Sequence, residues 1–569
     1  MQRINSRRPV PATSFISFVI AVFAACSPVY SLSPARTSSS ITAADAKLRI
    51  YQIADDSMKG RDAGGIGNFK MTDLLEREVR RLGLEPGGDN GTYFQVIPMV
   101  RRFVDSASTL SVDGRTLALY SEFAPNRPSN SVRTGTVLKG SFSVVYGGRA
   151  GDSLSTLTAN DAAGKIVVLD APLGSDRRPT GTYSTPLALA VSRYPRAAGI
   201  VIAALDLVTP AAATGLRSRG TGLSTGGARE VVRPIGIIVT KAVAELMMGA
   251  PITSLSPGAM GRGVTGNIWF VERPVDAPVR NVIAIVRGSD PLLKNEYVAI
   301  GAHSDHLAIL ATPVDHDSVL AFNTVMRPEG AQTRAGAPTP AQLTAFHSIL
   351  DSLRRVRPAR LDSVYNGADD DGSGSVALLE IAESLASGKR PRRSILLVWH
   401  TGEEAGLLGS AWFTDHTTVP HESIVAQLNM DMVGRGTAAD FPGGGPRNLQ
   451  VIGSRRLSTD LGNVLDSVNA SRPVSYVIDY SFDAPRHPQN RYCRSDHYMY
   501  ARTGIPIAYI SRGYHIAYHQ VIDEPEYINY EGLANVASFV ENVAMAVANR
   551  NDRVRVDKPK PDRLAPCRQ

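Results

Sequence analysis

Residues of the types that bind metal ions are concentrated in five short runs in the second half of the chain. Each run follows an apolar stretch with the length of a buried strand. The carboxyl ends of parallel strands meet at one edge of a sheet, where side chains from distant segments can form a site. In chain order the runs are Gly301-Ala302-His303-Ser304-Asp305-His306, residues 366–374, residues 399–410, Asn429-Met430-Asp431-Met432, and Ser495-Asp496-His497 with residues 513–519.

Two of these runs place carboxylates side by side at a turn from a strand into a helix. Asp369, Asp370 and Asp371 repel one another, so burying them together is costly without a cation. In the pair Glu403-Glu404, one carboxylate can hold a metal while its neighbour accepts a proton. Taken singly, either run is also explained as a solvated helix start, where acids match the positive end of the helix dipole.

The remaining runs add histidines and one enclosed acid. Neutral imidazole binds zinc well, and Asp305 could fix the tautomer of His303 by holding its other ring nitrogen. Asp431 lies within an apolar strand, so a metal or a basic residue such as Arg435 must satisfy it. Each signal is weak alone, but their joint occurrence in this order indicates a metal site.

The ordered series GAHSDH, NGADDDGSG, TGEEAGLLGS, NMDM, SDH and YHQ resembles the family of secreted dizinc aminopeptidases. That family also includes plasma glutamate carboxypeptidase, the transferrin-receptor ectodomain and glutaminyl cyclase. The motifs span residues 301–519, and residues 60–95 resemble the family's N-terminal helix and strand. Residues 164–168 and 196–201 resemble parts of a protease-associated domain. The resemblance therefore covers most of the chain.

The resemblance implies a role for each motif residue, with two Zn²⁺ ions per chain. His303 and Asp431 would hold one zinc, Glu404 and His519 the other, and Asp370 would bridge them. Glu403 would be the general base, Tyr518 would polarise the substrate, and Asp305 and Asp496 would support the ligands from behind. Two such ions share and acidify one water molecule, which attacks the peptide carbonyl. The resemblance thus implies a zinc exopeptidase, with an aminopeptidase favoured.

The pattern of apolar runs predicts an α/β fold around a mixed, mostly parallel sheet between helices. Predicted strands near residues 282–286, 297–301, 395–399, 424–432 and 505–510 alternate with predicted helices at 373–386, 405–415 and 530–548. Residues 45–84 are expected to form a helix and a turn. We divide the chain into a leader (1–26), a linker (27–40), a first peptidase part (41–101), a β-rich insert (102–272), the main peptidase domain (273–550) and a basic tail (551–569).

One departure from compact family members lies between the first two motifs. Residues 307–363 form a longer excursion, with a predicted helix at 340–356, that we interpret as a lid or an edge of the site. Arg486, Arg491 and Arg494 lie near the last motifs and could bind a free carboxylate. A carboxypeptidase, a dipeptidase, a one-zinc cyclase or a non-catalytic receptor-like protein on the same scaffold therefore stay open as alternatives.

The charge distribution argues against a nucleic-acid partner. The chain has 569 residues and a formal net charge of +8, with 43% hydrophobic and 20% charged residues. The first 25 residues contribute +3 and the segment from Asn549 contributes +4, which leaves the body almost neutral. We expect a peptide or dipeptide as substrate, and the oligomeric state stays open.

The N-terminal segment has the order of an export signal. Arg3, Arg7 and Arg8 precede an apolar stretch that ends in small residues before Cys26. Cys26 is a candidate for lipidation, with simple cleavage as the alternative, so we expect an exported protein in the periplasm, in the medium or anchored to the bacterial envelope. Three cysteines cannot form a disulfide framework, and a bridge between Cys493 and Cys567 is possible but not expected.

Overall fold

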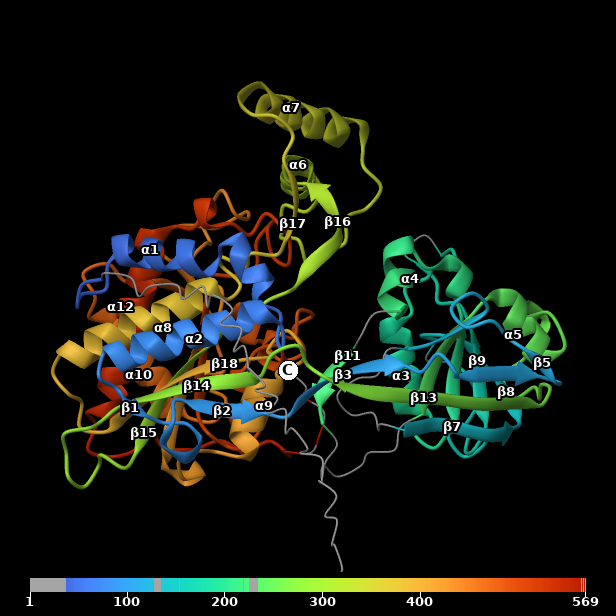
Figure 1. Cartoon of the computed structure of the whole chain (residues 1–569), viewed down its shortest axis with the longest axis horizontal. Coiled ribbons are helices and arrows are strands. Elements are labelled where there is room, and N and C mark those ends of the chain that lie inside the picture. The colour runs from blue at the N-terminus through green and yellow to red at the C-terminus, as the bar shows by residue number, and fades with distance from the viewer. Residues whose placement is uncertain are drawn as a thin grey trace, which may run out of the picture.

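A computed structural model shows the chain as a mixed-sheet body with a second globular part beside it (Figure 1). It describes residues 37–569 except 127–134, 153, 175–176, 218–219, 225–233, 564, 566 and 568. The predicted leader and Cys26 lie outside the described residues. No helix in the described part of the chain combines the length and the apolar character needed to cross a bilayer.

The body is built on a nine-stranded sheet with the order β1-β14-β18-β15-β19-β22-β20-β21, in which β2 also pairs with β14. The four central strands β18, β15, β19 and β22 are parallel, and antiparallel partners flank them on both sides. The bounds are β1 Glu85–Pro86, β2 Phe94–Ile97, β14 Val279–Val286, β15 Tyr297–His303, β18 Ser394–His400, β19 Ile424–Met430, β20 Asn448–Ile452, β21 Val477–Asp479 and β22 Ile507–Ser511.

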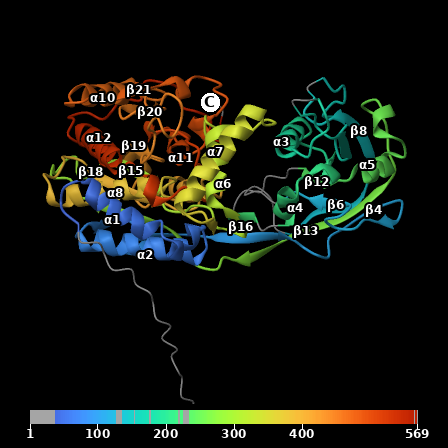
Figure 2. The same ribbon diagram turned by 90° about the horizontal axis from the view of Figure 1, so that it is seen from above.

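Helices cover both faces of this sheet (Figure 1), and Figure 2 shows one of the two helix layers from above. One face packs on α1 (Ala43–Ile53), α2 (Ile66–Arg81), α8 (Gly372–Ser387), α10 (Thr459–Ala470) and α12 (Tyr530–Ala548). The other face packs on α9 (Leu408–Asp415) and α11 (His497–Ala501). In β14, Val282 and Ala284 enter the first core while Ile283 and Ile285 enter the second, so the strand is apolar throughout. The predicted α/β fold is confirmed.

The N-terminal segment differs from the single predicted helix. It forms α1 and α2, separated by a short 3-10 turn, η1 (Asp56–Arg61). Gly60 in this turn has a positive φ of 67°, and a Cβ there would lie 2.3 Å from the carbonyl oxygen of Leu307. Glycine is required at this position because the turn packs directly against the start of the excursion.

The insert is more helical than its β-rich sequence suggests. A five-stranded sheet, β6-β12-β10-β9-β8, has four parallel strands, and a six-stranded antiparallel sheet lies beside it. Three α-helices are described here, α3 (Ser184–Arg193), α4 (Pro210–Arg217) and α5 (Lys241–Met248). The strands are β3 Met99–Val104, β4 Thr109–Val112, β5 Arg115–Thr116, β6 Phe123–Pro125, β7 Gly135–Phe142, β8 Val144–Arg149, β9 Ile166–Asp170, β10 Gly199–Ala203, β11 Gly220–Leu223, β12 Ile235–Val239 and β13 Val264–Pro274.

The chain enters and leaves the insert along two paired strands. β3 runs antiparallel to the end of β13, with Val100 opposite Pro274 and Val104 opposite Phe270. Buried ion pairs reinforce this ribbon, because Arg101 contacts Asp62 of the body at 2.6 Å and Arg102 contacts Glu272 at 2.9 Å. Figure 1 shows both strands crossing from the body into the insert.

The excursion forms an arm that projects from the body (Figure 1). It contains β16 (Ile309–Asp315), α6 (His316–Met326), α7 (Pro340–Val356) and β17 (Leu361–Val364), with β16 and β17 paired antiparallel. Arg354 of α7 and Arg357, which follows α7, form ion pairs with Asp317 of α6, and α7 has no buried residue. These ion pairs, rather than a buried apolar core, therefore hold α6 and α7 together.

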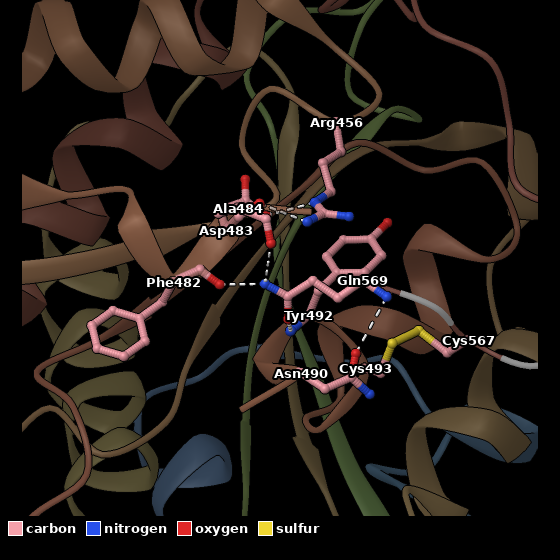
Figure 3. Close-up of a disulfide and its surroundings, with 9 residues drawn as sticks. All are labelled: Arg456, Phe482, Asp483, Ala484, Asn490, Tyr492, Cys493, Cys567 and Gln569. Carbon is pink, nitrogen blue, oxygen red and sulfur yellow. Dashed lines mark hydrogen bonds and ion pairs between the residues drawn. A yellow bond between two sulfur atoms is a disulfide. The ribbon is translucent and has the colours of Figure 1, made fainter. Parts of the chain in front are cut away.

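The C-terminal segment is fastened to the body. Cys567 forms a disulfide with Cys493, so the expectation of no bridge was wrong. The two residues are 74 positions apart, and only the folding of the tail across the body brings them together. Gln569 next to the bridge accepts a bond from the Tyr492 amide at 3.1 Å and donates from its own amide to Asn490 Oδ1 at 3.2 Å (Figure 3).

Candidate metal centre

The candidate ligands lie in loops at one edge of the central sheet. His303 is the last residue of β15, Glu403 and Glu404 follow β18, and Asp431 follows β19. Asp370 precedes α8, and His519 lies in the loop after β22. Because β15, β18, β19 and β22 are parallel, their carboxyl ends bring these loops together.

The three adjacent aspartates point in three directions, which relieves their mutual repulsion. Asp369 accepts from the Gly434 amide at 2.6 Å and contacts His515 Nε2 at 2.9 Å. Asp371 caps α8 and also accepts from the amide of His303 at 3.0 Å. The peptide bond between Asp370 and Asp371 is cis. Asp370 is thus the member of the run that faces the other candidate ligands.

The two oxygens of Asp370 face two different imidazoles. Oδ1 lies 3.3 Å from His303 Nε2, and Oδ2 lies 3.1 Å from His519 Nε2. Asp431 Oδ1 approaches the same His303 nitrogen at 3.9 Å, while Glu404 Oε2 lies 3.1 Å from the His519 nitrogen. Donor atoms around one tetrahedral zinc ion are about 3.3 Å apart, given metal–ligand distances of about 2.0–2.1 Å. The spacing therefore fits two ions that share Asp370.

His306 joins the second of these positions, and our sequence reasoning gave it no role. Its Nδ1 lies 2.7 Å from Glu404 Oε1 and 3.9 Å from Asp370 Oδ2. The short distance is that of a hydrogen bond to the Glu404 oxygen that His519 does not contact. Its place in the run HSDH was visible in the sequence, but the direction of a side chain beyond a strand end was not.

The charges of the site favour a cation between the carboxylates. Burial opposes a charged ring, yet Glu404 and Asp370 raise the pKa of His519 to about 10. Burial alone would raise the pKa of Asp370, but the hydrogen bonds from His303 and His519 hold it well below its usual range. Burial raises the pKa of Asp431 to about 6. Positive charge is thus strongly stabilised where the metal ions are expected, and the donor set fits zinc.

Asp305 is placed differently from its expected contact with the ring of His303. Its carboxylate lies 3.9 Å from His303 Nδ1, and the backbone carbonyl of Asp305 accepts from that nitrogen at 3.0 Å. Asp305 Oδ1 instead accepts from the amides of Gly402 and Glu403, at 2.7 and 3.1 Å. The side chain therefore positions the loop that carries Glu403, while its main chain orients the ring of His303.

Glu403 and Tyr518 line the same pocket as the candidate ligands, which has a volume of about 290 Å³. Burial raises the pKa of Glu403 well above its usual range. Burial likewise raises the pKa of Tyr518 well above its ordinary value, so the phenol stays protonated. The Tyr518 hydroxyl accepts a hydrogen bond from Arg494 at 3.1 Å, and the ring stacks on that of Tyr514.

Three further buried residues lie around the site, and two of them bond to its loops. Asp496 is fully buried beside the start of α11, and burial raises its pKa to about 7. Asp523 accepts from the amides of Asp369 and Asp370 at 3.1 and 3.0 Å. Arg61 donates to the carbonyl oxygens of Ser304, Asn366 and Gly367, which joins the first two ligand loops.

Arg61 and Asp523 were not predicted to act on the site. Arg61 was noted only as part of the N-terminal resemblance, and Asp523 follows the last motif without a distinctive pattern. Arg61 bonds backbone carbonyls of segments about 240 to 300 positions away in the chain, and no local signal predicts such contacts.

Comparisons with known proteins agree with this geometry. The model described as Peptidase family M28 matches residues 281–544. A probable leucine aminopeptidase of Arthroderma otae is 43% identical over 75 residues, which are 12% of this chain and 21% of that protein. A probable glutamate carboxypeptidase VP8 of Zea mays is 43% identical over 91 residues, 15% of this chain and 13% of that protein.

The chain thus matches about a fifth or less of the length of these two relatives. Among solved structures, the aminopeptidase from Aneurinibacillus sp. strain AM-1 aligns with a TM-score of 0.47 at 16% identity, over 91% of this chain and 97% of that one. The family match covers the strands and loops that carry all the candidate ligands. Residues 281–544 thus match the model of peptidase family M28, and this stretch includes all the candidate ligands.

Proposed function

We propose that the protein is a two-zinc exopeptidase that removes single residues from the N-terminus of peptides. The observation that carries this proposal is the geometry of Asp370, whose two oxygens each face the imidazole of a different ligand cluster. In this assignment His303 and Asp431 would hold one ion, Glu404 and His519 would hold the other, and Asp370 would contribute to both.

The residues of the chain divide the chemistry between them. When bound, two divalent ions supply Lewis acidity and lower the pKa of a water molecule that they share. Glu403 would accept a proton from the attacking water molecule and then deliver that proton to the leaving amine. Asp305 holds the backbone of Glu403 in place for both transfers.

Tyr518 stabilises the oxygen of the attacked carbonyl. Arg494 has only hydrogen-bond donors, so the Tyr518 hydroxyl must act as the acceptor in their contact. Its own proton is therefore free to bond to the substrate oxygen as negative charge develops there. A donor aimed at this charge contributes about 2.7–4 kcal/mol to catalysis.

A carboxypeptidase or dipeptidase with the same two ions is the second candidate. Arg494 favours it, because a guanidinium in the pocket wall suits a substrate that carries a free carboxylate. A one-zinc cyclase and a non-catalytic receptor-like protein are less well supported, because both clusters and Glu403 are present around one pocket.

The proposal also includes the cellular location of the protein and the role of the insert. The leader-like segment supports export, with or without lipid at Cys26. The resemblance to a protease-associated domain supports an insert that covers the site or contacts partners. Labelling with a radioactive fatty acid, compared between the wild type and Cys26→Ser, tests the lipid.

The function is tested with a panel of aminoacyl nitroanilides and dipeptides, before and after chelation. We expect release of nitroaniline, loss of turnover with the chelator, recovery with Zn²⁺, and two zinc equivalents per chain by elemental analysis. Undiminished turnover after complete removal of metal would contradict the proposal. Activity confined to N-blocked substrates would identify a carboxypeptidase.

A further inference from the structure

One side of the metal pocket carries a basic residue whose charge the catalytic scheme does not use, since the scheme uses only its hydrogen bond to the Tyr518 hydroxyl. The pocket lining contains four carboxylates, Asp370, Glu403, Glu404 and Asp431, and a single guanidinium, that of Arg494. Arg494 is exposed, donates to the Tyr518 hydroxyl and lies 5.4 Å from the centre of the Tyr514 ring. In the part of the chain that the structure describes, no ion pair links it to a carboxylate.

The neighbouring arginines are engaged elsewhere. Arg491 is buried, where it bonds to Gln450 and Gln489 and lies between the rings of Phe482 and Tyr514. Arg486 is exposed and does not line the pocket. Of the three arginines near the last motifs, Arg494 alone can therefore meet a bound substrate.

The backbone beside Arg494 is held on several sides. Cys493 is bridged to Cys567 and also lines the pocket. The side chain of Gln569 bonds to Tyr492 and Phe482, and Arg456 lies 4.1 Å from the centre of the Tyr492 ring (Figure 3). A charged group on a fixed backbone loses little conformational freedom when it binds a ligand.

The charge of the pocket favours an anion at Arg494. Two divalent ions would offset the four negative charges of the lining. The positive charge of the Arg494 guanidinium would then be the one charge in the pocket lining that no opposite charge balances. A guanidinium matches the geometry of a carboxylate, to which it donates two parallel hydrogen bonds.

We infer that Arg494 is a specificity-determining residue that binds a carboxylate carried by the substrate. The inference rests on the proposed exopeptidase function. The carboxylate can come from an acidic N-terminal side chain or from the free C-terminus of a dipeptide. In either case the carboxylate lies about one residue away from the peptide bond that is cleaved.

Matched substrate pairs distinguish these two sources. Aspartyl nitroanilide is compared with asparaginyl nitroanilide, and Leu-Gly is compared with Leu-Gly-amide. We expect the wild type to have the higher kcat/KM for the carboxylate member of one pair, mainly through a lower KM. Equal kcat/KM values within both pairs would overturn the inference.

The decisive variant is Arg494→Gln, with Arg486→Gln as a control that removes the same charge outside the pocket. We expect Arg494→Gln to lose about 10- to 100-fold in kcat/KM on the preferred carboxylate substrate, as for a lost hydrogen bond to a charged group. Its matched neutral substrate should also lose turnover, through the lost hydrogen bond to Tyr518, but at least several-fold less than the carboxylate substrate. An equal loss on both members would assign Arg494 to the orientation of Tyr518 alone.

A binding measurement keeps the inference testable if no substrate is turned over. Titration calorimetry of the zinc-loaded protein uses two matched pairs, aspartic acid α-amide against asparagine amide and Leu-Gly against Leu-Gly-amide, so that each carboxylate is compared with its neutral analogue. We expect the wild type to bind the carboxylate member of one pair more tightly and Arg494→Gln to lose that preference. If turnover is absent but this preference is present, the proposed function fails and the carboxylate site stands. Equal binding within both pairs by the wild type would refute the site.

Discussion

The two candidate metal positions share Asp370 but differ in their surroundings. At the first, the side chain of His303 is 1% exposed, and it is fixed by the backbone of Asp305. At the second, the side chain of His519 is 32% exposed and lies against the pocket. The first position is therefore enclosed at the end of the sheet, while the second is open to the pocket.

This difference in exposure suggests that the two metal positions have different roles. Enclosed ligands lose little freedom when they bind an ion, so the first position should hold its metal more tightly. The second position is more exposed, and the hydrogen bond between His306 Nδ1 and Glu404 Oε1 helps to orient Glu404 there.

Removing the shared ligand should abolish both positions. In Asp370→Ala, we expect loss of both zinc equivalents after dialysis and a fall in turnover to the level of the chelated wild type. Elemental analysis and circular dichroism would be compared with Asp351→Ala, an exposed acid on α7. If one full equivalent stays bound, the two ions do not depend on a common carboxylate.

Replacing the proposed base should affect the reaction but neither ion. Glu403→Gln keeps the shape of the side chain but cannot accept a proton. We expect kcat to fall by about 10²- to 10⁴-fold with two zinc equivalents retained. The exposed Glu422→Gln serves as the control. Turnover close to that of the wild type would remove Glu403 as the base.

Removing the His306 contact should weaken one position selectively. In His306→Asn, we expect the affinity for the second ion to fall by about 10- to 100-fold, as when a supporting hydrogen bond to a ligand is lost. Competition with a chelating dye resolves the two affinities, and His347→Asn on α7 is the control. Equal weakening of both ions would show that His306 only supports the general fold.

The smallest effect on activity is expected from the disulfide beside the second position. A bridge that closes a loop of this length contributes about 2–4 kcal/mol to stability. Cys567→Ser should therefore lower the melting temperature while kcat on a neutral substrate stays close to that of the wild type. Reductant should lower the melting temperature of the wild type and leave that of the variant unchanged. A variant as stable as the wild type would contradict this account.

The central sheet of the body could be predicted because its strands are apolar on both faces. Such runs are recognisable without knowledge of their neighbours, and β15, β18 and β22 lie within about two residues of their predicted positions. The helix predicted at residues 340–356 coincides with α7, whose start is marked by a Thr339 cap and Pro340. Once parallel strands are assumed, the convergence of the loops at their ends follows.

The details of the site depend on contacts that the sequence does not encode locally. Whether the carboxylate or the carbonyl of Asp305 meets His303 depends on a rotation of a few bonds after the strand ends. The contact of His306 with Glu404 depends on the spacing between two separate loops. The bridge from Cys493 depends on the path of the tail after α12. In the insert, α4 and α5 have only eight residues each, too few for a clear period.

The ribbon formed by β3 and β13 has a consequence for the history of the molecule. Val100 and Pro274 lie directly opposite each other, so the insert is attached at a single point of the body. An attachment whose two ends adjoin allows a whole folded unit to be gained, lost or exchanged without disturbing the sheet that bears the ligands. The peptidase scaffold can therefore acquire new accessory parts while its chemistry is preserved.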